Sequence, residues 1–392
     1  MRKAIRALTL LALATVSFPM LDPHGARAED AAVEALSSQQ KDFVFEVRKG
    51  QGSKVIKGFD ARAGQKIRLV GFGSMSLDQL RGGLKADTGD ALVDLGSGQQ
   101  LRIAGANADV VSAIQIPLDR SQYSPTFTDE FDALSLDLED GQSKGVWRTN
   151  FGYGGVHSRT LVNNGELQVY ADRLFSGTGS TSLKLDPFRI ADGKLDIVAE
   201  PLNEDLRRLT WGLSYSSGLL TTKASFSQTY GLFEIRAKLP KGKGLWPAFW
   251  LLPENRAWPP ELDVLEVLGD NMRKLYVSWH SNVGGKHTAD SKAIEVPDMS
   301  AEFHTYSVVW EKDTLMWFFD DVQVASRSTP EDFHLPMYML INLAVGGGWP
   351  ERVIAWLGLS GGAILLERIT TREAVSPSSS TQHTEKPNVM LR

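Results

Sequence analysis

Short runs of alternating hydrophobic and polar residues, separated by Gly, Pro, Asn and Asp, dominate most of this chain. The run LFEIRAKL (232–239) alternates well, LYVSWH (275–280) is a further strand candidate, and residues 315–325 resemble a hairpin. Residues 337–345 are almost continuously apolar and end at three glycines. Period-two alternation predicts half-buried strands, and a continuous apolar run predicts a fully buried one. Because no clear long helix occurs over 126–350, we expect an all-β sandwich or jelly roll there.

A separate block of short strands precedes this region, over about residues 31–120. Its predicted elements are strands at 43–47, 55–56 and 67–70, a short helix within 76–84, and a hairpin formed by 92–95 and 101–103. The block has no cluster of His or carboxylate side chains. We interpret it as a small β-rich accessory module for packing or attachment. Residues 121–125 are predicted to be a linker, and the Ser- and Pro-rich residues 371–392 a disordered tail.

The first residues have the pattern of an export signal. A basic start is followed by an apolar stretch over 7–21 and by Ala-Arg-Ala at 26–28, which predicts a signal peptide over 1–28. An uncleaved membrane anchor is the alternative, although the apolar run is short for a bilayer. Cleavage would remove four basic residues and one acidic residue and change the formal charge from −5 to −8. We therefore expect a secreted or periplasmic protein, monomeric, without membrane insertion after cleavage.

Composition excludes several kinds of chemistry. The chain has no cysteine, which excludes disulfides, thiol nucleophiles and cysteine-ligated metals. A net charge of −5 provides no polycationic surface for nucleic acid. Hydrophobic residues make up 42% and charged residues 23%, which is ordinary for a globular protein with a substantial core.

The most informative stretch is ELDVLE (261–266), which has three carboxylates separated only by aliphatic residues. On a strand, Glu261 and Asp263 point to the same face, but strict alternation would turn Glu266 to the other face. One bulge residue would return Glu266 to the first face and leave the aliphatic residues in the core. The alternative is a short amphipathic helix, because Pro259 and Pro260 are favourable at a helix start.

Closely spaced carboxyls are suited to acid–base chemistry on a glycosidic bond. Like charges at short range raise at least one pKa, so that one carboxyl stays protonated beside an ionised one. Retaining glycoside hydrolysis uses such a pair about 5–5.5 Å apart, one as nucleophile and one as acid and base. The third acid could orient the nucleophile. Spacing alone does not assign the individual roles.

An aromatic segment lies just before these acids. In GLWPAFWLLP (244–253), an extended backbone places Trp246, Ala248 and Trp250 on one face. Two indoles beside a small residue form a platform on which sugar rings can stack. Burial of both indoles in the core is the equally weighted alternative.

Taken together, these stretches resemble glycoside hydrolase family 16. The matching segments are GLFEIRAKLP (231–240), residues 246–253, ELDVLE (261–266), NGELQVY (164–170), FHTYSVVW (303–310) and INLAVGG (341–347), in family order. The resemblance covers about residues 126–350, and residues 146–269 look most similar to bacterial succinoglycan-cleaving exopolysaccharide depolymerases. The segment ILLERIT (364–370) departs from the usual last strand of the family, which puts that strand in doubt.

The resemblance implies a jelly-roll catalytic domain over 126–370 with a cleft across its concave sheet. It implies retaining endo-hydrolysis of β-1,3 or β-1,4 bonds in a polysaccharide, with Glu261 as nucleophile, Asp263 as its helper and Glu266 as general acid and base. The sugar-binding residues that it implies are Trp246, Trp250, Arg236, His280 and Asn164. No metal or other cofactor is implied for the chemistry, but some members hold a structural Ca²⁺, here expected near Asp129. A transglycosylase and a non-catalytic lectin-like protein are the alternatives.

Overall fold

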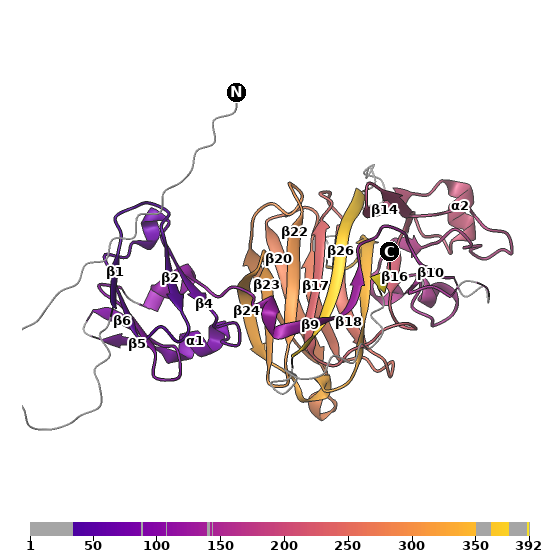
Figure 1. The fold of residues 1–392 in the computed structure, drawn as a ribbon. Helices are drawn as coiled ribbons and strands as arrows, with labels where there is room; N and C mark the ends of the chain where they lie inside the picture. The colour runs from indigo at the N-terminus through magenta and orange to yellow at the C-terminus, as the bar shows by residue number, and fades with distance from the viewer. Residues whose placement is uncertain are drawn as a thin grey trace, which may run out of the picture.

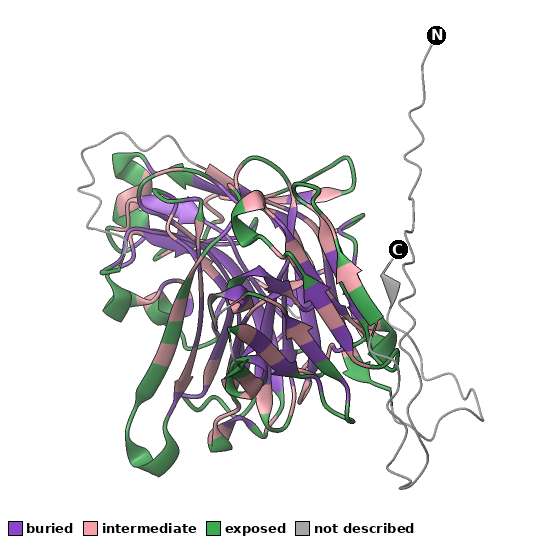
Figure 2. Cartoon of the chain, turned by 90° about the vertical axis from the view of Figure 1, so that its left-hand side faces the viewer, coloured by how far each residue is buried: buried purple, intermediate pink, exposed green. Residues whose placement is uncertain are grey.

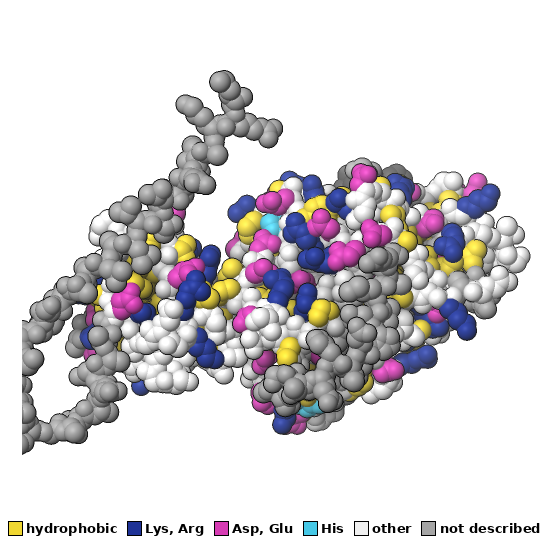
Figure 3. All heavy atoms as spheres, in the orientation of Figure 1, with side chains coloured by type: hydrophobic (Ala, Val, Ile, Leu, Met, Phe, Trp, Pro, Cys, Tyr) yellow, Lys and Arg dark blue, Asp and Glu magenta, His cyan; other side chains and the backbone are white. Residues whose placement is uncertain are grey.

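The computed structural model describes residues 34–87, 89–106, 108–138, 142, 144–349, 362–375 and 390–391. The predicted signal peptide and residues 376–389 of the predicted tail lie outside this range. Within it, no helix is both long and apolar enough to span a bilayer. Figure 1 shows a small N-terminal module beside a larger β-sandwich. On the face shown in Figure 3, basic and acidic side chains of the described residues are interspersed.

One sheet of the sandwich has eight strands among the described residues. In spatial order they are β10 (Leu136–Asp137), β11 (Trp147–Arg148), β16 (Leu219–Thr221), β25 (Met337–Val345), β18 (Leu245–Pro253), β19 (Glu261–Val267), β20 (Lys274–Ser281) and β21 (Thr288–Glu295). The long strands from β25 to β21 pair antiparallel. This sheet carries the candidate site.

The other sheet covers the first one. Its main path is β12 (Gln168–Tyr170), β15 (Tyr215–Ser217), β14 (Lys194–Pro201), β26 (Gly362–Ala374), β17 (Gly231–Lys238), β22 (His304–Trp310), β23 (Thr314–Phe319) and β24 (Val322–Ser328). β13 (Phe188–Ala191) pairs with β14, β9 (Tyr123–Asp129) pairs with β26, and β27 (Met390–Leu391) pairs with β9. A short helix, α2 (Glu204–Leu209), lies outside the sheets. The fold is therefore the expected all-β jelly-roll sandwich.

The core lies between the two sheets. Alternate residues of β17, such as Phe233 and Ile235, meet Phe249 of β18 and Leu262 of β19 in one hydrophobic cluster, and all four are buried. Figure 2 shows the buried positions running along the strands. Period-two alternation produces this arrangement because successive side chains of a strand point to opposite faces.

The predicted bulge in β19 is present. Asp263 pairs with Ser278 of β20 and Glu266 pairs with Tyr276, so that two residues of β19 oppose one residue of β20. Both bulge residues, Val264 and Leu265, are buried in the core. The helix alternative for this segment is therefore wrong.

A side chain from the opposite sheet holds the bulge. The indole Nε1 of Trp317, in β23, donates a hydrogen bond of 2.9 Å to the carbonyl oxygen of Asp263. Trp317 is buried in the same cluster as the bulge residues. A backbone carbonyl that the irregular pairing would otherwise leave unbonded thus has a partner.

The last strand, which the atypical sequence put in doubt, is present and central. β26 lies between β14 and β17 and also pairs with β9. Ile364, Leu366 and Ile369 are buried in the core, with a register shift opposite Arg236 and Ala237 that keeps them inside. Because β26 extends to Ala374, the prediction of disorder from residue 371 is wrong for 371–374.

The linker prediction for 121–125 is also wrong. Residues 120–122 form a 3-10 turn, and β9 starts at Tyr123. The Arg120 guanidinium binds the carboxylates of Glu234 and Asp321 and so fixes the start of the sandwich. Both carboxylates are distant in the sequence, so the local pattern of residues 121–125 does not show these contacts.

The N-terminal module has its own core between two small sheets. Their strand orders are β1-β3-β7-β6-β5 and β2-β4-β8. The strands are β1 (Glu34–Ser37), β2 (Val44–Arg48), β3 (Lys54–Lys57), β4 (Lys66–Val70), β5 (Leu84–Asp87), β6 (Asp90–Asp94), β7 (Gln100–Ile103) and β8 (Ile114–Gln115). The predicted hairpin, β6–β7, and the predicted short helix, α1 (Leu77–Gly83), are confirmed. Pairs such as β2–β4 and β3–β7 are parallel.

The module contacts the sandwich at β24, its edge strand. Gln323 of β24 accepts a hydrogen bond from the amide of Leu77 (2.6 Å) and donates one to the carbonyl of Met75 (3.1 Å). Ser326 Oγ accepts from the amide of Asp78 at 3.0 Å. These are free amides of the first turn of α1, which need partners outside the helix. The module thereby also covers an edge strand, which would otherwise expose unpaired backbone groups.

We expect Gln323→Ala to loosen this contact without unfolding the sandwich. The substitution leaves the Leu77 amide and the Met75 carbonyl without a partner at a buried position, at a cost of about 1–3 kcal/mol. Hydrogen exchange at residues 75–80 should accelerate, whereas exchange in β18 and β25 should not change. Gln122→Ala, at an exposed glutamine, is the control. Equal exchange at residues 75–80 in both variants would contradict the assigned contact.

Candidate active site

A cleft of about 710 Å³ lies across the eight-stranded sheet. Its floor is formed by residues of β18, β19, β20 and β25, and its walls by residues 151–166 and 256–258. Glu261, Asp263 and Glu266 all line it. The bulge thus brings the three predicted carboxyls onto the face that points into the cleft.

Each of the two outer carboxyls is bound by an indole. Trp258 Nε1 donates to Glu261 Oε2 at 2.8 Å, and Trp246 Nε1 donates to Glu266 Oε1 at 3.1 Å. In each carboxyl, therefore, one oxygen accepts a hydrogen bond from an indole and the other oxygen does not. This orients both groups and leaves Glu261 Oε1 and Glu266 Oε2 for other partners.

The middle carboxyl is the most buried. The Asp263 side chain is 3% exposed, against 16% for Glu261. Its Oδ2 accepts a hydrogen bond of 2.5 Å from the hydroxyl of Ser278, and the same hydroxyl lies 3.4 Å from Glu266 Oε2. Ser278 thus lies between the middle carboxyl and one outer carboxyl.

Burial raises the pKa of all three acids. For Glu261 and Glu266, loss of solvent is the largest cause, and the nearby charge of Asp263 raises their pKa further. Burial raises the pKa of Asp263 to about 7, against the lowering effect of the Ser278 hydrogen bond. The three groups therefore cannot all be ionised near neutral pH.

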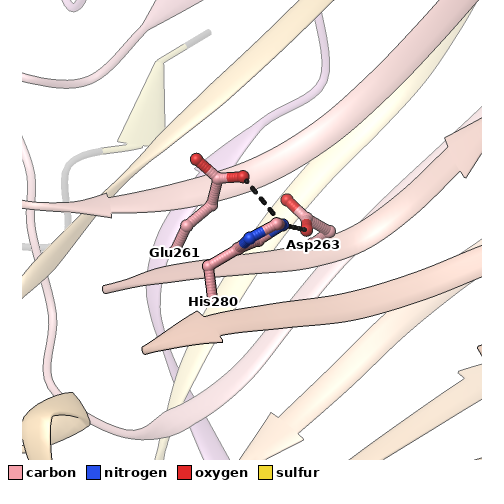
Figure 4. A group of neighbouring side chains, drawn as sticks. All are labelled: Glu261, Asp263 and His280. Carbon is pink, nitrogen blue, oxygen red and sulfur yellow. Dashed lines mark ion pairs between the residues drawn. The ribbon is translucent and has the colours of Figure 1, made fainter. Parts of the chain in front are cut away.

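His280 lies beside these acids, as the family resemblance implied. Its Nε2 is 3.6 Å from Glu261 Oε1 and 3.8 Å from Asp263 Oδ2 (Figure 4). Its Nδ1 lies 3.0 Å from Nε2 of His287. Burial, and then the neighbouring His287, lower the pKa of His280. The imidazole is therefore neutral near pH 7 and can contact the carboxyls without a full counter-charge.

The aromatic platform is only partly as expected. Trp246, Ala248 and Trp250 all line the cleft, but Trp250 is buried and donates from Nε1 to Asn342 Oδ1 at 2.7 Å. Trp250 therefore belongs to the floor, in agreement with the core alternative, while Trp246 stays half-buried. Trp349 is 40% exposed, and its ring lies edge-on to the ring of Trp246 with 5.4 Å between the ring centroids. It therefore extends the apolar surface of the cleft.

Two further predicted sugar-binding residues have different outcomes. Asn164 ends a 3-10 turn (Val162–Asn164), lines the cleft and donates to Glu166 Oε1 at 3.3 Å. Arg236 does not line the cleft, so its predicted sugar-binding role is wrong. It lies on β17 of the other sheet, pointing away from the core, where it pairs with Glu367 and donates to the carbonyl of Phe303.

Sequence reasoning missed Trp258, Ser278 and Trp349. Ser278 had a usable signal, because it is two residues before His280 in a predicted strand and so shares its face. Trp258 directly precedes the two prolines before Glu261, but nothing in the pattern shows that its indole reaches that carboxyl. Trp349 follows a run of glycines, where no periodicity places a side chain.

At the expected calcium position, near Asp129, the side chain is buried. Both oxygens of Asp129 already accept hydrogen bonds in the interior, from the amide of Phe131 (2.8 Å) and from Trp147 Nε1 (2.7 Å). Among the described residues, Glu261, Asp263 and His280 have ligand-type atoms within 4.8 Å of one another. Both carboxyls are already hydrogen-bonded, and we assign no metal to this group.

Comparisons with known proteins agree with this geometry. The sequence profile of "Glycosyl hydrolases family 16" matches residues 162–360. Two proteins of Rhizobium meliloti (strain 1021) are similar: the endo-1,3-1,4-beta-glycanase EglC, 41% identical over 323 residues, and the endo-1,3-1,4-beta-glycanase ExsH, 42% identical over 283 residues. These alignments cover 81% and 72% of this chain, but only 66% and 59% of the relatives.

Solved structures share the fold. The catalytic domain of an endo-1,3-beta-glucanase (laminarinase) from Thermotoga petrophila RKU-1 has a TM-score of 0.51 and 28% sequence identity. The match covers 65% of this chain and 99% of that domain. Coverage of nearly the whole catalytic domain but only part of this chain is expected if this chain has a sandwich domain and an additional module.

We expect Asp263→Asn to stabilise the protein at pH 8. Burial raises the pKa of this acid in the folded state to about 7, so ionisation of Asp263 disfavours folding increasingly as pH rises from about 4 to 7. An amide cannot ionise and still accepts from Ser278. The melting temperature should rise by roughly 4–8 °C at pH 8 and change little at pH 4. The control is Asp270→Asn, at an exposed position; equal effects of both variants at pH 8 would contradict the assigned burial penalty.

Proposed function

Because the chain belongs to glycosyl hydrolases family 16, we propose that it is a retaining endo-β-glycanase that cleaves β-1,3 or β-1,4 bonds of a polysaccharide. The observation that carries this proposal is the pair Glu261 and Glu266 on one cleft floor, each bound through one oxygen by an indole. The names of the two similar proteins, both endo-1,3-1,4-beta-glycanases, support a polysaccharide with β-1,3 or β-1,4 bonds as substrate. We propose a bacterial exopolysaccharide such as succinoglycan as the natural polymer.

In the first step, ionised Glu261 attacks the anomeric carbon through Oε1, the oxygen that does not accept from Trp258. The C–O bond to the leaving sugar breaks, and the leaving oxygen takes the proton of Glu266. The product is a glycosyl ester on Glu261 and a shortened chain. Trp258 stabilises the carboxylate form of the nucleophile because its N–H donates to it.

In the second step, a water molecule attacks the same carbon from the side that the leaving sugar occupied. Glu266, now ionised, takes a proton from this water, and the ester bond to Glu261 breaks. Both enzyme carboxyls return to their starting states. Two displacements at one carbon retain its configuration. With a sugar hydroxyl in place of water, the same steps would describe a transglycosylase.

Asp263 and His280 assist by position. Asp263 lies between the two catalytic carboxyls, and its charge raises the pKa of both. At Glu266 this favours the protonated acid, and at Glu261 the hydrogen bond from Trp258 acts in the opposite direction and lowers the pKa. His280 is neutral and borders the Glu261 oxygen proposed to attack, at 3.6 Å. The predicted signal peptide favours action outside the cytoplasm, secreted or periplasmic, where such polymers occur.

We expect Glu261→Gln and Glu266→Gln each to reduce cleavage at least 1,000-fold, because each removes a group that forms or breaks bonds in the reaction. Purified protein would be incubated with succinoglycan, laminarin, mixed-linkage glucan and agarose, and new reducing ends measured. Both variants should still bind the polymer that wild type cleaves, with an affinity close to that of wild type, as measured by calorimetry.

Glu254→Gln, at an exposed glutamate outside the cleft, is the matched control and should cleave normally. Wild-type-like turnover in either catalytic variant would refute the site. Redistribution of chain lengths without net release of reducing ends would identify a transglycosylase. Binding without any cleavage by the wild type would identify a lectin-like protein.

A further inference from the structure

Ser278 occupies the position between the middle carboxyl and one outer carboxyl of the cleft. It is 4% exposed and lies directly opposite Asp263 in the pairing of β19 with β20. The bulge moves Glu266 to the neighbouring pair, with Tyr276, so that a single hydroxyl reaches both carboxyls, at 2.5 and 3.4 Å. Without the bulge, Glu266 would lie on the opposite face.

A serine hydroxyl has one proton to donate and two lone pairs that accept. Its short bond to Asp263 Oδ2 uses the proton. Toward Glu266 Oε2 it can then only accept, and the partner that can donate to it is a protonated carboxyl. Trp246 Nε1 donates to Glu266 Oε1, so the proton of Glu266 belongs on Oε2, the oxygen nearer Ser278. These contacts are consistent with one arrangement, in which Glu266 is protonated and Asp263 accepts.

We propose that Ser278 is a positioning residue of the proposed hydrolase, whose hydroxyl couples Asp263 to Glu266 and selects the proton-bearing oxygen of Glu266. This inference rests on the proposed function. No bond to carbon forms at Ser278. When Glu266 has given up its proton in the first step, the hydroxyl can turn to donate to the new carboxylate, and it turns back when Glu266 regains a proton from water.

Other side chains with ionisable groups lie on the elements around this hydroxyl. They are Glu261 on β19, Tyr276 and His280 on β20, and His287, which contacts His280. On the far side, β21 places Ser291 opposite Ser278. Asp290 pairs with Arg327 and Lys292 donates to the carbonyl of Val324, so neither binds the hydroxyl. Asp263 and Glu266 are the two acids that Ser278 contacts directly.

The test compares Ser278→Ala, Ser278→Thr and wild type in kcat and KM across pH 4–9, on the polymer that wild type cleaves best. In the proposed arrangement the hydroxyl donates to ionised Asp263 and accepts from protonated Glu266, so it stabilises the protonated form of Glu266. Its removal should therefore lower the pKa of Glu266 and move the alkaline limb of the pH profile downward, by about 0.5–1 pH unit. The acid limb, which reports ionisation of Glu261, should not move, because Ser278 does not contact that carboxyl. We expect kcat at the wild-type optimum to fall about tenfold with little change in KM, and Thr to restore the wild-type profile.

Ser281→Ala is the matched control. This serine is on the same strand, is equally buried and also donates to an aspartate, Asp332 at 2.8 Å, but lies outside the cleft. It should change the melting temperature without moving the pH profile. An unmoved profile in folded Ser278→Ala, or a Thr variant that behaves like Ala, overturns the inference. Absence of cleavage by wild type would instead overturn the proposed function.

Discussion

The bulge in β19 is the constraint on which this molecule depends. Three carboxyls within six residues can share one face of a strand only if the pairing with β20 skips a position. The skip is held from both sides, because Val264 and Leu265 are buried in the core and Trp317 of the opposite sheet bonds the Asp263 carbonyl. The same bulge thus places its aliphatic side chains in the core and the acids in the cleft.

Burying three acids together is costly, and the fold offsets that cost with neutral donors instead of cations. Trp258, Trp246 and Ser278 supply the hydrogen bonds, and no Lys or Arg forms an ion pair with these acids among the described residues. A guanidinium would lower all three pKa values and leave Glu266, the proposed general acid, ionised. Indole and hydroxyl groups orient the carboxyls while leaving their pKa values high, as a reaction with one ionised and one protonated acid requires.

Among the described residues, neither the second sheet nor the module supplies a side chain to the cleft lining. β26, atypical in sequence, closes the second sheet between β14 and β17 and holds β9. The module covers the free edge at β24, where Gln323 and Ser326 serve as external caps of α1. These contacts lie on the sheet opposite the cleft, which separates the binding surface from the parts that anchor it.

Local sequence determined what depends on neighbours in the chain. Alternation predicted the strands and the sandwich, and the spacing of Glu261, Asp263 and Glu266 predicted the bulge, since a strand has a fixed period of two. Tertiary structure alone decided what depends on distant partners. It moved Arg236 out of the cleft by placing β17 in the other sheet, and it ordered residues 121–125 through Glu234 and Asp321. It also brought the Trp258 indole to Glu261 and placed Ser278 directly opposite Asp263, because contacts across strands depend on which residues of the two strands pair, and one strand alone does not specify that.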